Sequence, residues 1–154
     1  MNILREWKKV YEADLGSVVL ELVEFLEKPA VILLSGELGS GKTTFTKAFV
    51  NKMNTGVNTT SPSYSLVQEA GDIVHSDFYR LNDASEVVHL ELPMYLEGKN
   101  YLFVEWGKGF LRELYQEIPH EFSFYEILFE VINENVDTNR SSRNLKLISL
   151  PNQK

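Results

Sequence analysis

The stretch from Ser35 to Phe45, SGELGSGKTTF, restricts the possible fold more than any other part of the chain. It follows the apolar run AVILLS at residues 30–35, whose length and composition predict a strand buried on both faces. It leads into KTTFTKAFVNKM at residues 42–53, where the spacing of the apolar side chains predicts a helix. Glycines at such a junction are typical of a tight loop whose backbone approaches a ligand closely. The order of strand, glycine-rich loop and helix favours an α/β fold.

Within this stretch, Gly36, Gly41, Lys42 and Thr43 match the phosphate-binding pattern G-x-x-x-x-G-K-[ST]. In that pattern the loop N–H groups point at phosphate oxygens, and the helix that follows adds its positive end. We therefore expect Lys42 to reach the outer phosphates of a nucleotide and Thr43 to ligate Mg²⁺. The predicted nucleotide-binding segment comprises Gly36, Glu37, Leu38, Gly39, Ser40, Gly41, Lys42, Thr43 and Thr44, with no chemistry assigned to the Glu37 side chain.

The rest of the chain alternates between strand and helix signals and then ends in two strands. Strands are predicted at residues 64–70, 73–79 and 100–106, helices at 14–28, 82–92 and 107–118, and the final strands at 121–132 and 144–150. This order predicts a mostly parallel central sheet flanked by helices, with antiparallel strands from the C-terminal part. We expect a P-loop NTPase fold that forms a single domain over residues 1–154.

Composition narrows the class of protein. The chain of 154 residues has no cysteine, which excludes disulfides, thiol catalysis and cysteine-ligated metal sites. Its net charge of -7 makes it a poor stand-alone binder of DNA or RNA, because phosphate contacts need a basic surface. The first ten residues, MNILREWKKV, are too charged for a signal peptide, and no apolar run reaches the length of a membrane span. We expect a soluble, cytoplasmic protein without a membrane partner.

Two acids are candidates for holding Mg²⁺ beside the glycine-rich loop. Glu105 ends the apolar strand YLFVE, and Asp77 ends IVHSD. Ligands of open α/β sheets lie at the carboxyl ends of strands, so both positions favour a role in the site. Trp106 follows Glu105 directly and is either a wall of the nucleotide site or an aromatic of the core or the surface.

Other polar positions carry weaker signals. The three histidines, His75, His89 and His120, lack the spacing of metal ligands and are assigned structural roles. Guanine-recognition signals are missing, because NKMN at residues 51–54 lacks the acid of an N-K-x-D motif. Adenine is therefore favoured over guanine. RSSR at residues 140–143 is the one candidate for the arginine-bearing lid of a small-molecule kinase.

Four segments together resemble the bacterial tRNA threonylcarbamoyladenosine biosynthesis ATPase family, TsaE, also called YjeE. They are GELGSGKTTFTKAFV, TSPSYSLVQEA, HSDFYRL and LFVEW, in this order and at short spacings. The match covers residues 32–106. It departs from the family at Ser63, where the family usually has threonine, and in EVVHLELPMYLEG, which has no glycine before Gly98.

The resemblance implies a small P-loop ATPase that is weakly active alone. It implies partners, a threonylcarbamoyl-transferase subunit and its paralogous partner (TsaD- and TsaB-like), and contact with tRNA through that complex. Together they would modify the adenosine next to the anticodon. ATP binding would favour assembly, and ATP hydrolysis to ADP would reset the complex.

The same resemblance assigns roles to individual residues. Glu105 corresponds to the Walker B-like acid that holds Mg²⁺ with Thr43, and Asp77 to an acid of hydrolysis or magnesium organisation. Trp106 matches the family's tryptophan, and Ser63 belongs to the switch-like loop SPSY at residues 61–64. Lys42, Asp77 and Glu105 are thus the predicted catalytic residues.

Two other functions stay open at this point. A small-molecule kinase would transfer phosphate to an acceptor. An ATP-dependent assembly module would bind nucleotide without needing hydrolysis. Arg80 is a candidate arginine finger or a partner contact.

Overall fold

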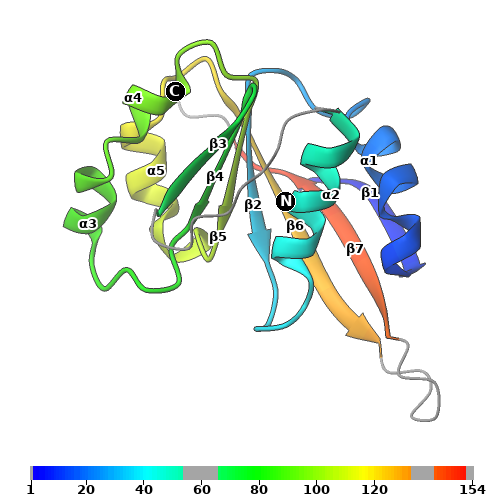
Figure 1. The fold of residues 1–154 in the computed structure, drawn as a ribbon. Coiled ribbons are helices and arrows are strands. Elements are labelled where there is room, and N and C mark those ends of the chain that lie inside the picture. Colours follow the sequence, from blue (N-terminus) through cyan, green and yellow to red (C-terminus); the bar gives the residue numbers. More distant parts are fainter. Residues whose placement is uncertain (1, 54–65, 133–140, 152–154) are drawn as a thin grey trace.

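The computed structural model describes residues 2–53, 66–132 and 141–151. It contains one seven-stranded sheet with the order β1-β7-β6-β2-β5-β4-β3 (Figure 1). The strands are β1 (Asn2–Val10), β2 (Ala30–Ser35), β3 (Val67–Ala70), β4 (Ile73–Asp77), β5 (Tyr101–Glu105), β6 (Ser123–Ile132) and β7 (Ser142–Ser149). The four central strands β4, β5, β2 and β6 run parallel to one another, while β3, β7 and β1 each pair antiparallel with a neighbour.

Helices cover both faces of this sheet. The α-helices are α1 (Leu15–Leu22), α2 (Lys42–Met53), α3 (Ala84–His89), α4 (Leu92–Leu96) and α5 (Leu111–Glu117), with short 3-10 helices η1 (Glu12–Asp14) and η2 (Lys108–Phe110). Helices α1 and α2 lie on one face, and α3, α4 and α5 lie on the other (Figure 1). None of the helices in the described residues is long and apolar enough to cross a bilayer.

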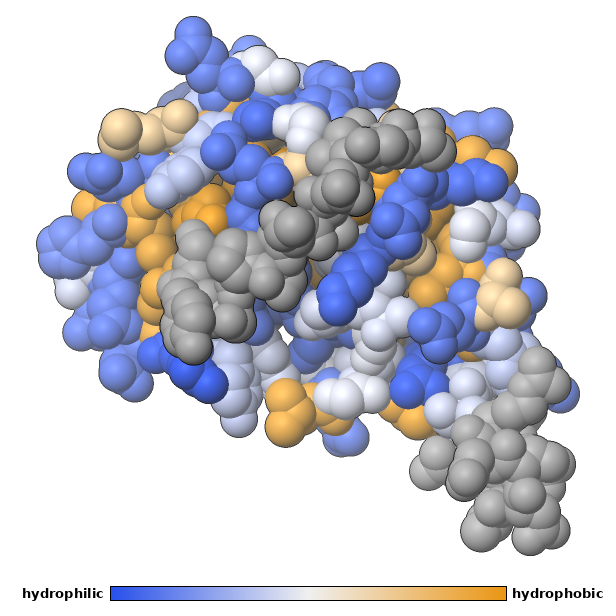
Figure 2. All heavy atoms as spheres, viewed as in Figure 1, coloured by the Kyte–Doolittle hydropathy of each residue, from blue (hydrophilic) through white to orange (hydrophobic). Residues whose placement is uncertain are grey.

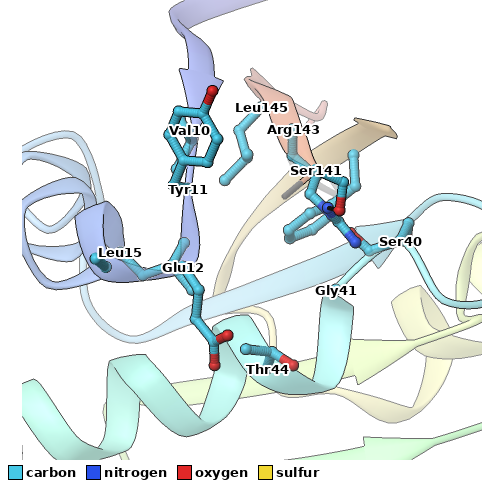
Figure 3. Close-up of a pocket in the computed structure, with 12 residues that line it drawn as sticks. Val10, Tyr11, Glu12, Leu15, Ser40, Gly41, Thr44, Ser141, Arg143 and Leu145 are labelled. Carbon is cyan, nitrogen blue, oxygen red and sulfur yellow. Dashed lines mark hydrogen bonds between the residues drawn. The ribbon is translucent and has the colours of Figure 1, made fainter. Parts of the chain in front are cut away.

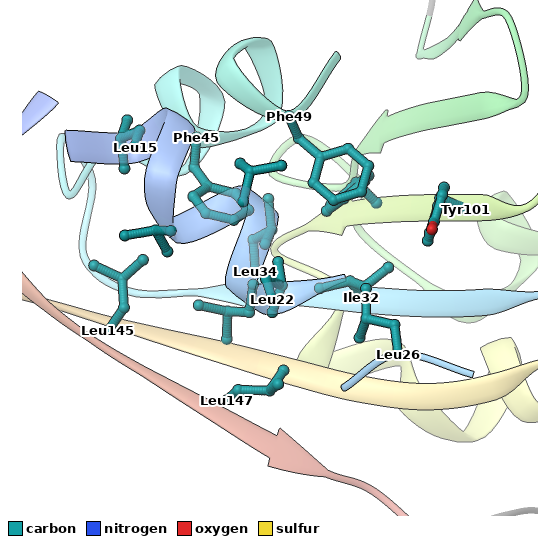
Figure 4. Close-up of a cluster of buried hydrophobic side chains, with 14 of the residues drawn as sticks. Leu15, Leu22, Leu26, Ile32, Leu34, Phe45, Phe49, Tyr101, Leu145 and Leu147 are labelled. Atoms are coloured by element: carbon teal, nitrogen blue, oxygen red, sulfur yellow. The ribbon is translucent and has the colours of Figure 1, made fainter. Parts of the chain in front are cut away.

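Strand β2 divides the core because both of its faces are buried, as its continuous apolar sequence predicts. Its alternate residues enter two clusters: Ile32 packs toward α1 and α2, and Leu33 packs toward α5. Figure 4 shows Phe45 and Phe49 projecting from α2 onto the strands. Phe49 contacts the Phe103 ring edge-on, with the centroids 4.7 Å apart. The packing of α2 therefore fixes where the loop at the carboxyl end of β2 must lie.

The outer surface is mostly polar. Figure 2 shows hydrophilic residues over most of the visible face, with apolar residues in separate places between them. Leu38, at the tip of the glycine-rich loop, is 74% exposed, and Met94 is 75% exposed. The exposed apolar side chain at Leu38 lies on the same segment as the predicted phosphate contacts.

The sequence predicted most of these elements. The strand at residues 30–35 and the helix at 42–53 have the predicted bounds, and the two C-terminal strands β6 and β7 pair antiparallel as expected. The helix predicted at 82–92 is two helices, because the backbone at Glu91 is left-handed, with φ 55°, and Pro93 begins the next turn. The helix predicted at 14–28 ends as α1 at Leu22.

Candidate functional site

The glycine-rich loop, Gly36–Gly41, connects β2 to α2 at the carboxyl edge of the parallel strands. Its backbone has φ 80° at Gly39 and 101° at Gly41, a left-handed region that favours glycine. Gly36 is required for a different reason: a Cβ there would lie 2.7 Å from Ser40 Oγ and 2.9 Å from the carbonyl oxygen of Phe129. The loop therefore curls tightly against β6, and the first residue of α2 follows at once.

Lys42 is that first residue, and its side chain folds back over the loop. Its ammonium donates to the Gly36 carbonyl oxygen at 2.6 Å and lies 3.5 Å from the centroid of the Trp106 ring. The side chain is only 4% exposed. Burial lowers the pKa of the ammonium, while the charges of Glu105 and Asp77 act in the opposite direction. A buried ammonium at the loop is suited to bind an anion.

Glu105 is a buried carboxylate, 3% exposed, at the end of β5. Thr43 Oγ1 donates to it, with Oε1 at 2.8 Å and Oε2 at 2.9 Å, and His75 Nε2 lies 2.6 Å from Oε2. Burial alone raises the pKa of Glu105, but the hydrogen bond and charge of His75, the Thr43 hydroxyl and the charge of Lys42 outweigh it. The pKa therefore lies below the ordinary value, so the carboxylate is ionised at neutral pH.

Asp77 ends β4 directly beside Glu105, since the two residues are partners in the parallel register of β4 and β5. Its side chain is exposed and accepts a hydrogen bond from the Tyr79 N–H at 2.9 Å. Two carboxylates thus stand at neighbouring strand ends, one buried and one open to solvent. The open one is the better placed to contact water.

Trp106 has a positive φ of 59°, which is uncommon for a residue other than glycine. The turn it makes carries its ring over Lys42, and the Tyr79 ring packs against it with centroids 5.1 Å apart. Trp106 therefore packs partly buried against the core while its ring faces Lys42, at the end of the loop.

A cavity of about 320 Å³ lies beside the loop on the side of β7. Figure 3 shows Arg143 reaching from β7 to Ser40, and the Glu12 carboxylate pointing toward Thr44 at the start of α2. Arg143 donates through Nε to the Ser40 carbonyl oxygen at 3.0 Å and through Nη2 to that of Gly39 at 3.3 Å. The cavity is lined from three separate parts of the chain, by Val10, Tyr11, Glu12, Ala13, Leu15, Ser40, Gly41, Thr44, Phe129, Ser141, Arg143 and Leu145.

The structure thus brings Lys42, Thr43, Asp77, Glu105 and Trp106 to one edge of the sheet. The other predicted positions are not part of this group. Ser63, with the rest of SPSY at 61–64, and Arg140 lie outside the described residues. Arg80 is exposed.

Two residues of the site were not identified from the sequence. His75 was assigned a structural role, but it contacts Glu105 directly. The alternation along β4 could have indicated it, because His75 and Asp77 are two residues apart and so share a face. Arg143 was considered as part of a lid or as a contact to nucleotide, partner or tRNA. Its contact to the loop at Ser40 joins residues that are 103 positions apart in the chain.

The oxygen atoms of Thr43 and Glu105 are suited to a hard divalent cation, which prefers hydroxyl, carboxylate and phosphate ligands. No group of three or more Asp, Glu or His side chains that could hold a metal forms within the described residues. Mg²⁺ at nucleotide sites usually takes one or two protein oxygens and the substrate's phosphates, so this small donor set fits such a cation.

The chain matches a family model described as threonylcarbamoyl adenosine biosynthesis protein TsaE over residues 11–140. A protein of Bacillus subtilis named tRNA threonylcarbamoyladenosine biosynthesis protein TsaE is 32% identical over 116 residues, covering 73% of this chain and 72% of the relative. A protein of Haemophilus influenzae with the same name is 32% identical over 158 residues, covering 98% of this chain and 85% of the relative.

A crystal structure of Bacillus subtilis YdiB has a similar fold. The TM-score is 0.62 at 22% identity, with 99% of this chain and 90% of the other covered. The family match extends over the loop, both strand-end acids and the tryptophan between β5 and η2. The chain belongs to the TsaE family of threonylcarbamoyl adenosine biosynthesis proteins.

Proposed function

We propose that this protein is a P-loop ATPase that acts as an ATP-dependent switch in the N6-threonylcarbamoyladenosine modification of tRNA. The observation that carries the proposal is the convergence of Lys42, Thr43 and Glu105 at the carboxyl edge of the sheet. Membership of the TsaE family supplies the biological setting. The fold we assign is that of P-loop NTPases, with β2, the glycine-rich loop and α2 as its phosphate-binding unit.

We place ATP along the loop, with its adenosine in the cavity beside it. The cavity touches Ser40, Gly41 and Thr44, so it opens where the phosphate chain would leave the loop. Its wall includes Tyr11 and Glu12. The Glu12 carboxylate can accept hydrogen bonds from the ribose hydroxyls or from the exocyclic amine of adenine. A phosphate chain would also give Ser40 Oγ, a buried hydroxyl with no partner among the described residues, a group to bind.

Thr43 and Glu105 are the residues that would hold Mg²⁺, which when bound supplies positive charge to the β- and γ-phosphate oxygens. In the structure the Thr43 hydroxyl donates a hydrogen bond to the Glu105 carboxylate. The lone pairs of the Thr43 oxygen therefore stay available to a cation. The ionised carboxylate maintains this, because it can only accept the hydrogen bond.

Hydrolysis would proceed by in-line attack of water on the γ-phosphate. Lys42 and the loop N–H groups would stabilise the charge that develops on the phosphoryl oxygens. Asp77 is the exposed acid beside Glu105, and we assign it the orientation of the attacking water. The chain's contribution is then positioning and charge, without a covalent intermediate.

ATP binding would favour assembly with a TsaD-like transferase subunit and its TsaB-like paralogue, and hydrolysis would release the complex for another turnover. Contact with tRNA would come through these partners, in the cytoplasm. The chain's own net charge of -7 fits this indirect contact.

The test compares wild type with Glu105→Ala in a reconstituted modification reaction, with the exposed Glu24→Ala as the matched control. We expect Glu105→Ala to support about one round of modification per complex and then stop, while Glu24→Ala continues like wild type. Continued turnover of Glu105→Ala at the wild-type rate would show that the protein is an assembly module without essential hydrolysis. ATP consumption that depends on an added small-molecule acceptor would instead indicate a kinase.

A further inference from the structure

His75 lies beside the site, and the mechanism above does not use it. It lies in β4, which is hydrogen-bonded on one side to β3 and on the other to β5. Its Nε2 is 2.6 Å from Glu105 Oε2, and its side chain is 18% exposed. A strand held on both sides is a rigid support, so the imidazole has a fixed place from which to contact the carboxylate.

The contact belongs to a short chain of hydrogen bonds, His75–Glu105–Thr43. The Glu105 carboxylate is hydrogen-bonded to Thr43 of α2 and to His75 of β4, two elements that are separate in sequence. Both partners are needed to hold the Glu105 carboxylate in one orientation. A carboxylate bound only by Thr43 can rotate about its terminal torsion, because that torsion has broad energy wells. The fixed orientation then decides where the Thr43 proton points, and hence where its oxygen lone pairs are presented.

We propose that His75 is a positioning residue that sets the Mg²⁺ requirement of nucleotide binding by fixing the Glu105 carboxylate against Thr43. The inference rests on the proposed function, since it concerns the cation that would accompany ATP. It assigns His75 no contact with the nucleotide. Partners that orient a metal-binding group commonly change metal affinity by about 10- to 100-fold when they are removed.

The same geometry predicts which substitutions preserve the role. Glutamine carries a terminal amide N–H that can donate to a carboxylate much as imidazole Nε2 does. Leucine has a similar volume but no donor. His75→Gln should therefore behave as the conservative variant, and His75→Leu as the one that removes the hydrogen bond. His89→Gln, at an exposed position of α3, is the control.

The experiment measures binding of a non-hydrolysable ATP analogue, first in EDTA and then with increasing Mg²⁺. We expect the Mg²⁺ concentration at half-maximal binding to rise by about 10- to 100-fold in His75→Leu, and by much less in His75→Gln. His89→Gln should match wild type. Cooperative unfolding in urea reports independently that each variant is folded.

Two results would overturn the inference while leaving the proposed function standing. One is an unchanged Mg²⁺ requirement in a folded His75→Leu protein. The other is an equal loss in His75→Gln and His75→Leu, which would point to packing and not to a donated hydrogen bond. Failure of wild type itself to bind the analogue in a Mg²⁺-dependent way would overturn both the inference and the proposed function.

Discussion

The fold removes the charged side chain of Lys42 almost entirely from water. A buried cation of this kind is stabilised by binding an anion. The Lys42 ammonium contacts the Gly36 carbonyl oxygen and the Trp106 ring. A nucleotide phosphate would offer it a stronger, fully charged acceptor. The contacts seen in the structure are therefore those of a donor that is ready to exchange partners.

Replacing this lysine tests that interpretation. We expect Lys42→Ala to weaken ATP binding by at least about tenfold, because hydrogen bonds to charged groups contribute roughly 1.5–3 kcal/mol. Isothermal titration calorimetry measures the effect, with Lys47→Ala, an exposed position on the same helix, as the control. Equal affinity for Lys42→Ala and wild type would refute the assignment of the loop.

Glu105 gives a prediction about acid stability. The pKa of its carboxyl in the folded chain lies below the ordinary value, so the folded state favours the ionised form more than the unfolded state does. The stabilisation is therefore complete above the unfolded pKa and is lost as the pH falls toward the folded pKa. The hydrogen bond and charge of His75, the Thr43 hydroxyl and the charge of Lys42 are the contacts that favour the ionised form.

The variant Glu105→Gln cannot titrate at this position. Between about pH 6 and about pH 3.5, wild type should lose more unfolding free energy than Glu105→Gln does, as measured by urea denaturation at each pH. Parallel pH profiles of the two proteins would contradict the pKa shift assigned to this carboxylate.

Local patterns in the sequence predicted the residues of the site better than they predicted the contacts between them. Lys42 and Thr43 belong to a contiguous motif, and Glu105 and Asp77 stand at recognisable strand ends. The role of His75 depends on β4 lying next to β5 with its residues in a particular register, and no local pattern specifies that register.

At the scale of elements, β7 supports the glycine-rich loop from the side. Arg143 offers a planar set of donors to the carbonyl oxygens of Ser40 and Gly39, and a third bond of 2.5 Å joins its Nη1 to Ser141 Oγ. These bonds engage carbonyl oxygens of the loop, which are not the groups that would contact a phosphate. They also tie the C-terminal hairpin to a loop that is encoded more than 100 residues earlier.

Removing this support should loosen the loop. We expect Arg143→Gln to weaken ATP binding by roughly tenfold, since it removes two charge-assisted hydrogen bonds to the loop backbone. Arg112→Gln, at an exposed position of α5 on the other face of the sheet, is the control. ATP affinity measured by calorimetry should fall only in the first variant. If both variants bind like wild type, Arg143 does not support the loop.

Strand β1 was not predicted from the sequence, and its burial explains why. Within Asn2–Val10 only Trp7 and Val10 are buried, and the pairing with β7 is irregular between Ile3 and Arg5 and again between Trp7 and Val10. Such a strand lacks the alternation of apolar and polar residues that marks a half-buried strand. Its charges suit an edge of the sheet, where they oppose pairing with another chain.

For the whole molecule, the core and the site depend on one arrangement. The parallel order β6-β2-β5-β4 brings the carboxyl ends of the central strands to one edge, and α2 packs its aromatic side chains across them. The sequence predicted this centre because buried parallel strands are continuous apolar runs. The order of the strands within the sheet, and the position of β1 beside β7, depend on long-range pairing that no local segment specifies.

The central proposal is that this chain is the ATP-dependent switch of tRNA threonylcarbamoylation, and reconstitution tests it most directly. The reaction contains the transferase subunit, its paralogous partner, tRNA, ATP and the activated threonylcarbamoyl donor, which a separate enzyme forms from threonine, bicarbonate and ATP. It is run with or without this protein. The modified nucleoside is then measured over several turnovers. We predict sustained formation only when the wild-type chain is present, and little with Lys42→Ala. Equal yields with and without the chain would contradict the claim.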